Sequence, residues 1–316
     1  MQTRTLGHTD ITVVPLMLGG NVFGWTIDEA ASFEVLDAFV ARGLNFIDTA
    51  DVYSRWVPGN QGGESETILG KWFKARGTRE KIVLATKVGM DLGDRKEGLK
   101  AKYIVEAVEA SLKRLQTDHI DLYQSHKDDE STPLDETLEA YQKLIAEGKV
   151  RAIGASNYTG ARLREALRVS KDKGLPSYET LQPEYNLYDR KGYETDLEPV
   201  AEEFGLGVVP YFSLASGFLT GKYKTREDAK GAKRVSRVDK YFDARGEKIL
   251  RALGEVAEET GAKEASVALA WLLARPSITA PIASATSPGQ LEALAAAVEL
   301  TLDAAAVKKL DEASAY

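Results

Sequence analysis

Four side chains that could together move a proton lie at or just beyond short apolar runs of the sequence. Asp48 and Lys87 each end such a run, and His126 directly follows a third one. Tyr53 lies in the loop five residues after Asp48. A tyrosine with a pKa of about 10 is a weak acid at neutral pH, and a neighbouring ammonium lowers that pKa by stabilising the phenolate. We therefore expect Lys87 to lower the pKa of Tyr53, with Asp48 as the counter-charge of a buried Lys87. His126 would orient and polarise a carbonyl group.

The elements that must position these residues follow from the alternation of short apolar runs with longer segments of helical period, which is typical of repeated βα units. The expected strands are residues 14–18, 45–49, 81–88, 119–125, 150–155, 180–183, 207–211 and 278–282. Expected helices include residues 28–41, 102–115, 134–146, 159–173 and 197–204. Eight such units predict an α/β fold, a closed (β/α)8 TIM barrel. Because the active site of such a barrel lies at the carboxyl ends of its strands, the four side chains should converge on one mouth.

Two further features concern the same fold. Segments 3–7 and 11–13 could form a β-hairpin that closes the barrel floor. An open doubly wound sheet is the alternative architecture, but the glycines of residues 19–24 lack the spacing of a dinucleotide-binding fingerprint. We therefore favour the barrel.

Composition narrows the classes of protein and partner. The 316 residues fit one α/β-barrel domain spanning residues 1–316. A net charge of -7 disfavours a surface for nucleic acid, and no apolar run is long enough to cross a membrane. The chain has no cysteine and three histidines, so we expect neither thiolate chemistry nor a metal site. Its first residues lack the apolar core of a signal peptide, which makes the cytoplasm the expected location.

Five short motifs occur in the order typical of the aldo-keto reductase superfamily, and the chain is identified as a member from residue 6 to about residue 294. The motifs are Phe46 to Tyr53, Gly63 to Glu66 with Leu69-Gly70, Ala85 to Lys87, Asp121 to His126, and Ile153 to Asn157. The resemblance implies an oxidoreductase that reduces aldehydes or ketones by hydride transfer from a nicotinamide. Tyr53 would be the general acid, and His126 would help to hold the carbonyl oxygen as negative charge grows there.

The resemblance also implies a set of cofactor-binding residues. Ser156, Asn157 and Gln182 match positions that contact the nicotinamide carboxamide, and Tyr211 matches the aromatic residue that stacks on the ring. The other matches to cofactor-contacting positions are Gly20, Asn21, Val22, Asp48, Ser213, Leu214, Ser216 and Lys222. These last four lie in the stretch that resembles the cradle for the diphosphate and the adenosine ribose.

The adenine end of this site departs from the family pattern. Ser284 and Gln290 stand where many relatives that prefer the phosphorylated cofactor have cations. Neutral groups can still hydrogen-bond a 2′-phosphate, and Ser287-Pro288 resembles a helix N-terminus that would add backbone donors. NADP (NADPH) is therefore the expected cofactor, with NAD possible.

One segment could shape access to the site. Residues 221–246 carry many basic residues, among them Lys233, Arg234 and Arg237. They form either a solvated surface loop or a lid over a phosphorylated cofactor, and the resemblance favours the lid.

The substrate pocket would be walled by the aromatic residues Trp25, Trp56 and Phe212, which suits unspecialised carbonyl compounds. Arg55 could engage an anionic substrate, although a solvated arginine is the simpler interpretation. The expected partner is a small-molecule carbonyl substrate. Its identity, the direction of the reaction in the cell and the oligomeric state are left open by the sequence.

Two other functions compete with the reductase. One is a nicotinamide redox-sensing protein with little turnover, because the complete set of four side chains does not exclude a binding role. The other is a barrel aldolase in which Lys87 forms a Schiff base with substrate. The aldolase is disfavoured because Asp48 would keep Lys87 protonated, whereas a Schiff-base lysine must be partly neutral.

Overall fold

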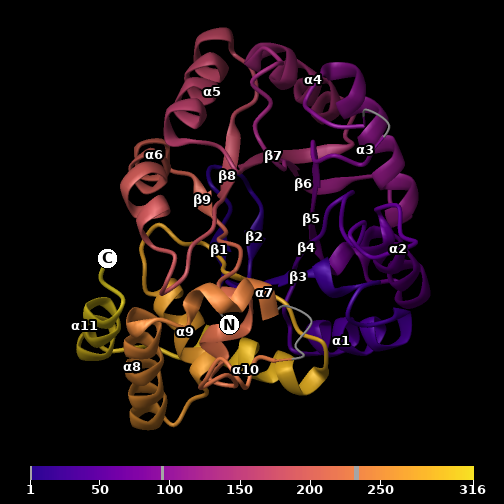
Figure 1. Cartoon of the computed structure of the whole chain (residues 1–316). Coiled ribbons are helices and arrows are strands. Elements are labelled where there is room, and N and C mark those ends of the chain that lie inside the picture. Colours follow the sequence, from indigo (N-terminus) through magenta and orange to yellow (C-terminus); the bar gives the residue numbers. More distant parts are fainter. Residues whose placement is uncertain (1, 94–95, 231–234) are drawn as a thin grey trace.

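Eight parallel strands form a sheet that curls around a central axis, with helices on its outside (Figure 1). The structure is a computed structural model and describes residues 2–93, 96–230 and 235–316. In chain order the strands of the barrel are β3 (Met17–Gly19), β4 (Phe46–Asp48), β5 (Val83–Val88), β6 (Ile120–Ser125), β7 (Val150–Ser156), β8 (Tyr178–Gln182), β9 (Gly207–Val208) and β10 (Ile282–Ala283). Each strand pairs in parallel with the next, from β3 to β9.

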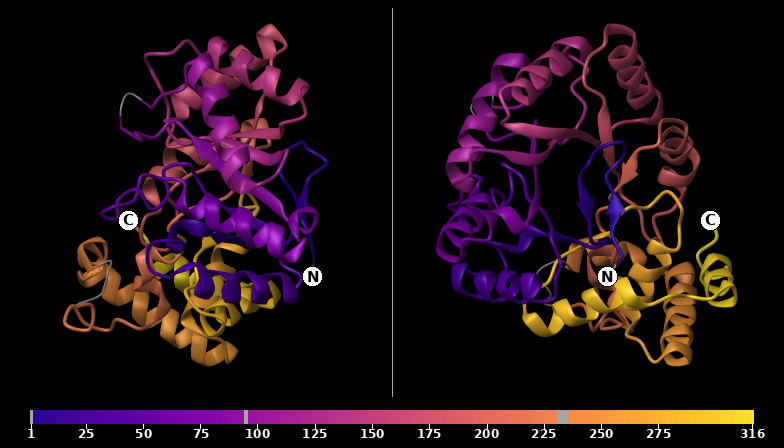
Figure 2. Two further views of the ribbon diagram at one scale, coloured as in Figure 1. Left: turned by 90° about the vertical axis from the view of Figure 1, so that its right-hand side faces the viewer. Right: turned by 180° about the vertical axis from the view of Figure 1, so that it is seen from behind.

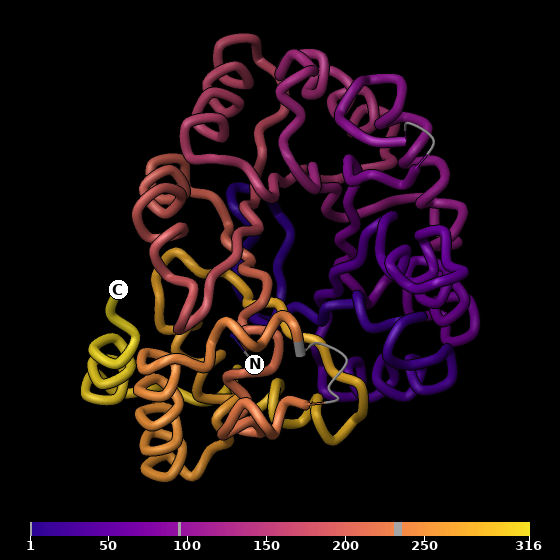
Figure 3. Tube along the Cα trace, in the orientation of Figure 1, coloured from indigo at the N-terminus to yellow at the C-terminus, as the bar shows by residue number. Residues whose placement is uncertain are grey.

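The last strand closes the ring. β10 pairs with β3, so the two ends of the barrel sequence lie side by side, as the tube in Figure 3 shows. On its other side this segment meets β9, because Thr279 N donates to Val208 O over 2.7 Å and Ile282 N donates to Pro210 O over 2.9 Å. The predicted (β/α)8 barrel is confirmed.

Helices cover the outside of the barrel. They are α1 (Glu29–Ala41), α2 (Glu64–Arg76), α3 (Ala101–Leu115), α4 (Leu134–Ala146), α5 (Gly160–Lys173), α6 (Glu198–Phe204), α7 (Val235–Val238), α8 (Ala244–Thr260), α9 (Glu264–Leu273), α10 (Pro288–Glu299) and α11 (Ala304–Ala313). Local sequence sets their ends. The Asp28 side chain accepts a hydrogen bond from Ala31 N at the start of α1, and Gly174 ends α5 with a φ of 64°, which glycine adopts without strain.

The N-terminal hairpin fills the bottom of the barrel. β1 (Arg4–Thr5) pairs antiparallel with β2 (Thr12–Val13), and Figure 2 shows the hairpin across the barrel when the molecule is seen from behind. Its buried residues belong to one apolar cluster with inward-facing strand residues: Leu6, Ile11, Val13, Met17, Phe46, Ala85, Leu122, Ala152, Val209, Ala280 and Ile282. The hairpin therefore closes the end opposite the site, as expected.

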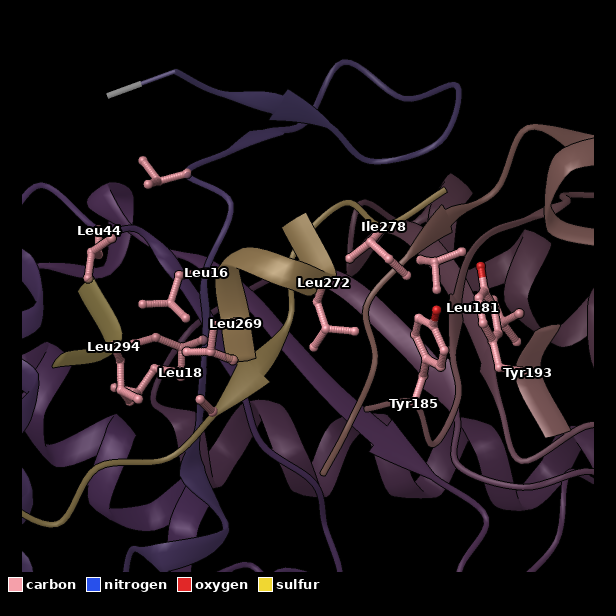
Figure 4. Close-up of a cluster of buried hydrophobic side chains, with 14 of the residues drawn as sticks. Leu16, Leu18, Leu44, Leu181, Tyr185, Tyr193, Leu269, Leu272, Ile278 and Leu294 are labelled. Atoms are coloured by element: carbon pink, nitrogen blue, oxygen red, sulfur yellow. The ribbon is translucent and has the colours of Figure 1, made fainter. Parts of the chain in front are cut away.

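A second apolar layer joins the strands to the helices. In Figure 4, Leu16 and Leu18 lie beside Leu269 of α9 and Leu294 of α10, and these four side chains are buried. Fully burying a leucine contributes roughly 1.5–3 kcal/mol. This layer holds the first strand in place against the helices that precede and follow β10.

The strand bounds differ from the predicted ones, most of all for β9 and β10, where proline interrupts the strands. β9 ends at Val208 rather than residue 211, and β10 begins at Ile282 rather than residue 278. Pro210 and Pro281 lie in the missing parts. Since proline has no backbone N–H to donate to a ladder, the regular strands are short there.

The predicted loop at residues 221–246 is only partly a loop. It contains α7, a short 3-10 helix (Asp239–Tyr241) and the start of α8. Lys233 and Arg234, which we expected in the lid, lie outside the described residues.

Candidate active site

The carboxyl ends of the parallel strands bring the predicted side chains to one mouth of the barrel. Asp48 is the last residue of β4, Lys87 lies near the end of β5, and His126 directly follows β6. The strand register places Asp48 beside Gly19 of β3 and Lys87 beside Gln124 of β6. Residues far apart in the sequence are therefore neighbours at this edge.

Lys87 is the centre of a buried hydrogen-bonded group that includes Asp48 and Tyr53. Its side chain is 0% exposed, and its Nζ lies 2.6 Å from Asp48 Oδ1. Lys87 Nζ also donates to Thr49 O and to the Tyr53 hydroxyl, each over 2.8 Å. The three donors of a lysine ammonium thus have three acceptors. The Tyr53 hydroxyl in turn donates to Asp48 Oδ2 over 2.8 Å.

The pKa of Tyr53 is shifted in the direction opposite to the predicted one. We expected Lys87 to lower it, but in this structure it is raised well above the ordinary value for tyrosine. Burial is the main cause, and the charge of Asp48 together with the hydrogen bond to it adds to the effect. Burial also lowers the pKa of Lys87, while Asp48 opposes that shift. The contact with Lys87 is present, but Asp48 and desolvation outweigh it.

His126 is a neutral imidazole beside the phenol. Its ring centroid lies 6.0 Å from that of Tyr53, and its backbone O accepts a hydrogen bond from Asn157 Nδ2. Burial, and then the charge of Lys87, holds its pKa well below the ordinary histidine value. A neutral imidazole can donate one N–H to a carbonyl oxygen. His126 Nδ1 is buried without a hydrogen-bond partner among the residues that the structure describes.

Polar side chains from the next strands continue this network. Gln182, which ends β8, donates from Nε2 to Asp48 Oδ1 over 3.0 Å. The Tyr211 hydroxyl donates to Asn157 Oδ1 over 2.9 Å, and Asn157 Nδ2 donates to Ser156 Oγ over 3.0 Å. These groups form a polar patch beside the group of Asp48, Tyr53 and Lys87.

A cleft of about 1100 Å³ opens over this mouth. Its walls include Tyr53, His126, Trp56 and Phe212. The predicted cofactor residues that line it are Asn21, Val22, Asp48, Ser156, Asn157, Gln182, Tyr211, Ser213, Leu214, Ser216, Lys222, Ser284 and Gln290. Ligand pockets of drug-sized molecules are typically about 300–1,000 Å³, so this cleft is larger than most of them.

Three predicted site residues do not line the cleft. A Cβ at Gly20 would lie 2.9 Å from Asp48 O, so this glycine allows close packing behind the site. Trp25 packs edge-on against Trp56, with ring centroids 5.4 Å apart. Lys87 is buried and donates to the hydroxyl of Tyr53, which lines the cleft.

Three cleft residues have backbone conformations that side chains disfavour. Asn157, Phe212 and Ser216 have φ values of 55°, 52° and 57°. Non-glycine residues in this left-handed region are strained and concentrate at binding sites. These strained residues lie in the segments after β7 and β9, which carry predicted cofactor contacts.

The adenine end of the predicted cofactor site is organised by short polar contacts. Ser284 Oγ donates to Asn21 Oδ1 over 2.7 Å, and Gln290 Oε1 accepts from Thr286 N over 2.9 Å. Ser287 caps α10 by accepting from Gln290 N, as its sequence predicted. Ser284 and Gln290 therefore hold the loop after β10 in shape.

Charged residues of α7 and of the start of α9 also line the cleft. Arg237 was expected in the lid, whereas Lys263 and Glu264 were not assigned to the site from the sequence. Arg237 lies over the Phe212 ring at 5.6 Å. Lys263 does not follow a strand, and the helix α9 after it is apolar and buried along most of its length, so nothing in the sequence signalled that Lys263 lines a site. With Lys222, these cations and the N-termini of α9 and α10 fit a phosphorylated dinucleotide.

The fold and the site define a parallel α/β barrel with a buried aspartate, lysine and tyrosine group at its mouth. Residues 15–315 match the model of the Aldo/keto reductase family, so the chain belongs to this family of oxidoreductases, which generally use nicotinamide cofactors.

Relatives with curated names agree with this assignment. The "Uncharacterized oxidoreductase YrpG" of Bacillus subtilis is 39% identical over 320 residues, covering 99% of this chain and 95% of that protein. "Aldo-keto reductase YhdN" of the same organism is 35% identical over 293 residues, with 90% and 84% covered. The "Probable voltage-gated potassium channel subunit beta" of Arabidopsis thaliana is 32% identical over 313 residues, with 95% and 92% covered. In the described part of the chain, the helices are too short or too polar to cross a membrane.

Proposed function

We propose that the protein reduces aldehydes or ketones to alcohols with NADPH, and that Tyr53 is the general acid. The observation that carries this proposal is the Tyr53 hydroxyl, which lies 2.8 Å from both Lys87 Nζ and Asp48 Oδ2. Tyr53 also lines a cleft with His126 and the polar patch that follows β7 and β8. A proton donor and a site for a nicotinamide thus meet at one place.

In this reaction, different side chains of the protein bind the cofactor and the substrate. Ser156, Asn157 and Gln182 would hold the carboxamide of the nicotinamide, and Tyr211 would lie against its ring. The bound cofactor supplies a hydride to the carbonyl carbon. His126, as a neutral donor, binds the carbonyl oxygen and stabilises the charge that grows on it.

Tyr53 then gives its proton to that oxygen. Its hydroxyl must turn from Asp48 Oδ2 to the developing alkoxide, while the Lys87 ammonium stays against the phenolate oxygen. Stabilisation by Lys87 is therefore largest when the proton has left. Asp48 keeps Lys87 charged and fixed in position throughout.

The preference for NADPH over NADH rests on the cations that line the cleft. Lys222, Arg237 and Lys263 are available to a phosphorylated ribose, in place of the cations that are missing at Ser284 and Gln290. Charge-assisted hydrogen bonds to a phosphate are about twice as strong as neutral ones. Lys263→Met should raise the KM for NADPH more than the KM for NADH. A KM for NADH far below that for NADPH in the wild-type protein would overturn this preference.

The direct test of the proposed function is a titration with NADPH and NADH, followed by a panel of aldehydes, ketones and sugars monitored through cofactor absorbance. We expect tight nucleotide binding and substrate-dependent oxidation of NADPH. Nucleotide binding without turnover of any carbonyl compound would contradict the reductase.

A second function is favoured by one specific observation. The resemblance to a protein named a probable potassium channel β subunit covers 95% of this chain. A redox-sensing protein would exchange its nucleotide slowly, turn over little and co-purify with a protein partner. The aldolase interpretation loses support, because Lys87 is buried with three acceptors and lies 2.6 Å from Asp48. Borohydride trapping of a carbonyl substrate on Lys87 would restore it.

A further inference from the structure

Arg55 lies on the same wall of the cleft as the proposed proton donor. It follows Tyr53 by two residues, and both line the cleft. The turn between them is fixed, because Arg55 N donates to Val52 O over 3.1 Å and Ser54 Oγ donates to Phe23 O over 2.7 Å. The buried Ser54 has a φ of 72°, so the turn is held by its surroundings. The position of Arg55 relative to Tyr53 is therefore well defined.

The guanidinium of Arg55 has no ion-pair or hydrogen-bond partner among the residues that the structure describes. The residue is partly buried, so its charge is only partly solvated. Arginines elsewhere near the barrel have partners; Arg114, for example, lies 2.6 Å from the buried Glu66. An arginine presents five donors in a planar fork that matches a carboxylate. These donors are free for a ligand in the cleft.

The opposite side of Arg55 is closed by the loop after β5. A Cβ at Gly93 would lie 2.8 Å from Arg55 Nη2, so the guanidinium packs directly on this glycine. Asp91 lines the cleft in the same loop, but its Oδ1 accepts from Gly93 N over 2.5 Å. Asp91 and Arg55 are both among the described residues, and no ion pair joins them. The described residues of this loop therefore support Arg55 without forming an ion pair with it.

Arg55 is also separate in the fold from the cations assigned to the cofactor. Lys222, Arg237 and Lys263 come from the segments between β9 and α9, whereas Arg55 comes from the loop after β4, which carries Tyr53. Its neighbours in the lining include the apolar side chain of Trp56. Among the described residues, this part of the cleft brings together the cation of Arg55, the apolar wall of Trp56 and the proposed proton donor Tyr53.

We propose that the physiological substrate is a carbonyl compound that carries a carboxylate, which Arg55 binds while the carbonyl oxygen faces Tyr53 and His126. This inference rests on the proposed reductase function. It assigns Arg55 as the residue that selects anionic carbonyl compounds from neutral ones of the same shape.

The test compares a carboxylate with its neutral ester in the full-length protein with NADPH. The acid is 4-carboxybenzaldehyde and the ester is methyl 4-formylbenzoate. In the wild type we expect the kcat/KM for the acid, divided by the kcat/KM for the ester, to be greater than one. Arg55→Met should lower this ratio by roughly 10- to 100-fold, mainly through the KM of the acid, because a hydrogen-bonded charge pair is lost. Arg55→Lys keeps the charge without the fork and should give an intermediate ratio. Asp91→Asn removes a negative charge that would repel the substrate carboxylate. It should therefore raise the ratio of kcat/KM for the acid to kcat/KM for the ester. Aliphatic oxo-acids of increasing chain length and their methyl esters extend the comparison to other spacings.

Arg168→Met is the matched control, because Arg168 is exposed on α5 and does not line the cleft. It removes the same charge from the protein and should leave the ratio at the wild-type value. Equal ratios in the wild type and Arg55→Met across all acid and ester pairs would overturn the inference while leaving the reductase intact. If the wild type reduces neither the acids nor the esters, the proposed function itself fails.

Discussion

The Tyr53 hydroxyl donates a hydrogen bond to Asp48 Oδ2 over 2.8 Å. Its oxygen accepts from Lys87 Nζ over the same distance, and that ammonium lies 2.6 Å from the other oxygen of Asp48. The phenol is therefore held between a carboxylate that attracts its proton and an ammonium that would stabilise its anion. In this arrangement the proton is retained, and it becomes available when an alkoxide competes with Asp48 for it.

The ionisation of Tyr53 should therefore be displaced to high pH. Burial and Asp48 raise its pKa well above the ordinary tyrosine value of about 10. Tyrosinate absorbance of the nucleotide-free protein should be the same for the wild type and Tyr53→Phe up to about pH 10. Extra tyrosinate in the wild type at lower pH would show instead that Lys87 dominates.

Lys87 should be essential to stability because it neutralises a buried carboxylate. Lys87→Met leaves Asp48 charged and buried, and breaking such a pair typically costs about 3–5 kcal/mol. The loss is measured by urea unfolding. Adding Asp48→Asn should recover part of it, since the stranded charge is gone.

Lys102→Met supplies the control for that experiment. Lys102 is 89% exposed, and its ion pair with Glu106 spans 3.8 Å on the surface of α3. Exposed pairs contribute about 0.2–1 kcal/mol. If Lys87→Met cost no more than Lys102→Met, the buried ion pair would not be a structural requirement.

His126 should lower the free energy of unfolding in mild acid. Its pKa is held low in the folded protein, mainly by burial, so the unfolded chain binds a proton near pH 6.5 that the folded chain does not. Stability due to this residue is present above about pH 6.5 and is lost as pH falls below it. The decrease in the free energy of unfolding from pH 7 to 5 should be smaller in His126→Gln. The exposed His8, replaced in the same way, controls for the loss of a histidine.

Asp51 should make stability depend on pH in the sense opposite to His126, so that stability falls as pH rises. Its side chain is 1% exposed, and burial, followed by the nearby Glu66, raises its pKa well above the ordinary value. Both carboxyl oxygens lack hydrogen-bond partners in the described part of the chain. The folded protein thus retains a proton that the unfolded chain releases, and stability is lost as pH rises above about 4.

Asp51→Asn removes this titration with little change in shape. The variant should gain stability relative to the wild type between pH 4 and pH 8, as measured by urea unfolding at each pH. Asp172→Asn, on the exposed end of α5, should run parallel to the wild type. A constant difference between Asp51→Asn and the wild type would show that Asp51 is ionised at all these pH values.

The convergence of Asp48, Lys87 and His126 was predictable because parallel strands of a barrel place their carboxyl ends together. The pairing of Lys87 with Asp48 followed from the cost of burying an unpaired ammonium. The net effect on Tyr53 did not follow, because Lys87 and Asp48 lie at equal distances from its hydroxyl and only coordinates show this balance.

The part of the cleft wall that Lys263 and Glu264 form could also not be predicted from the sequence. Lys263 and Glu264 begin a helix rather than following a strand, and their position over the cleft depends on how α9 packs against the barrel. The short strands β9 and β10 were predicted too long, although Pro210 and Pro281 signalled the interruption. Arg55 was considered a solvated side chain, because sequence alone does not show whether an arginine has a partner.

The central claim, that Tyr53 supplies the proton, is tested most directly in a single turnover. The protein loaded with NADPH is mixed with an aldehyde that the wild type reduces, and the loss of cofactor absorbance is followed for the wild type and Tyr53→Phe. Cofactor affinity should be nearly the same in both, while the rate for Tyr53→Phe should fall at least about 100-fold, the size of a lost general acid. Equal single-turnover rates in the two proteins would contradict the account.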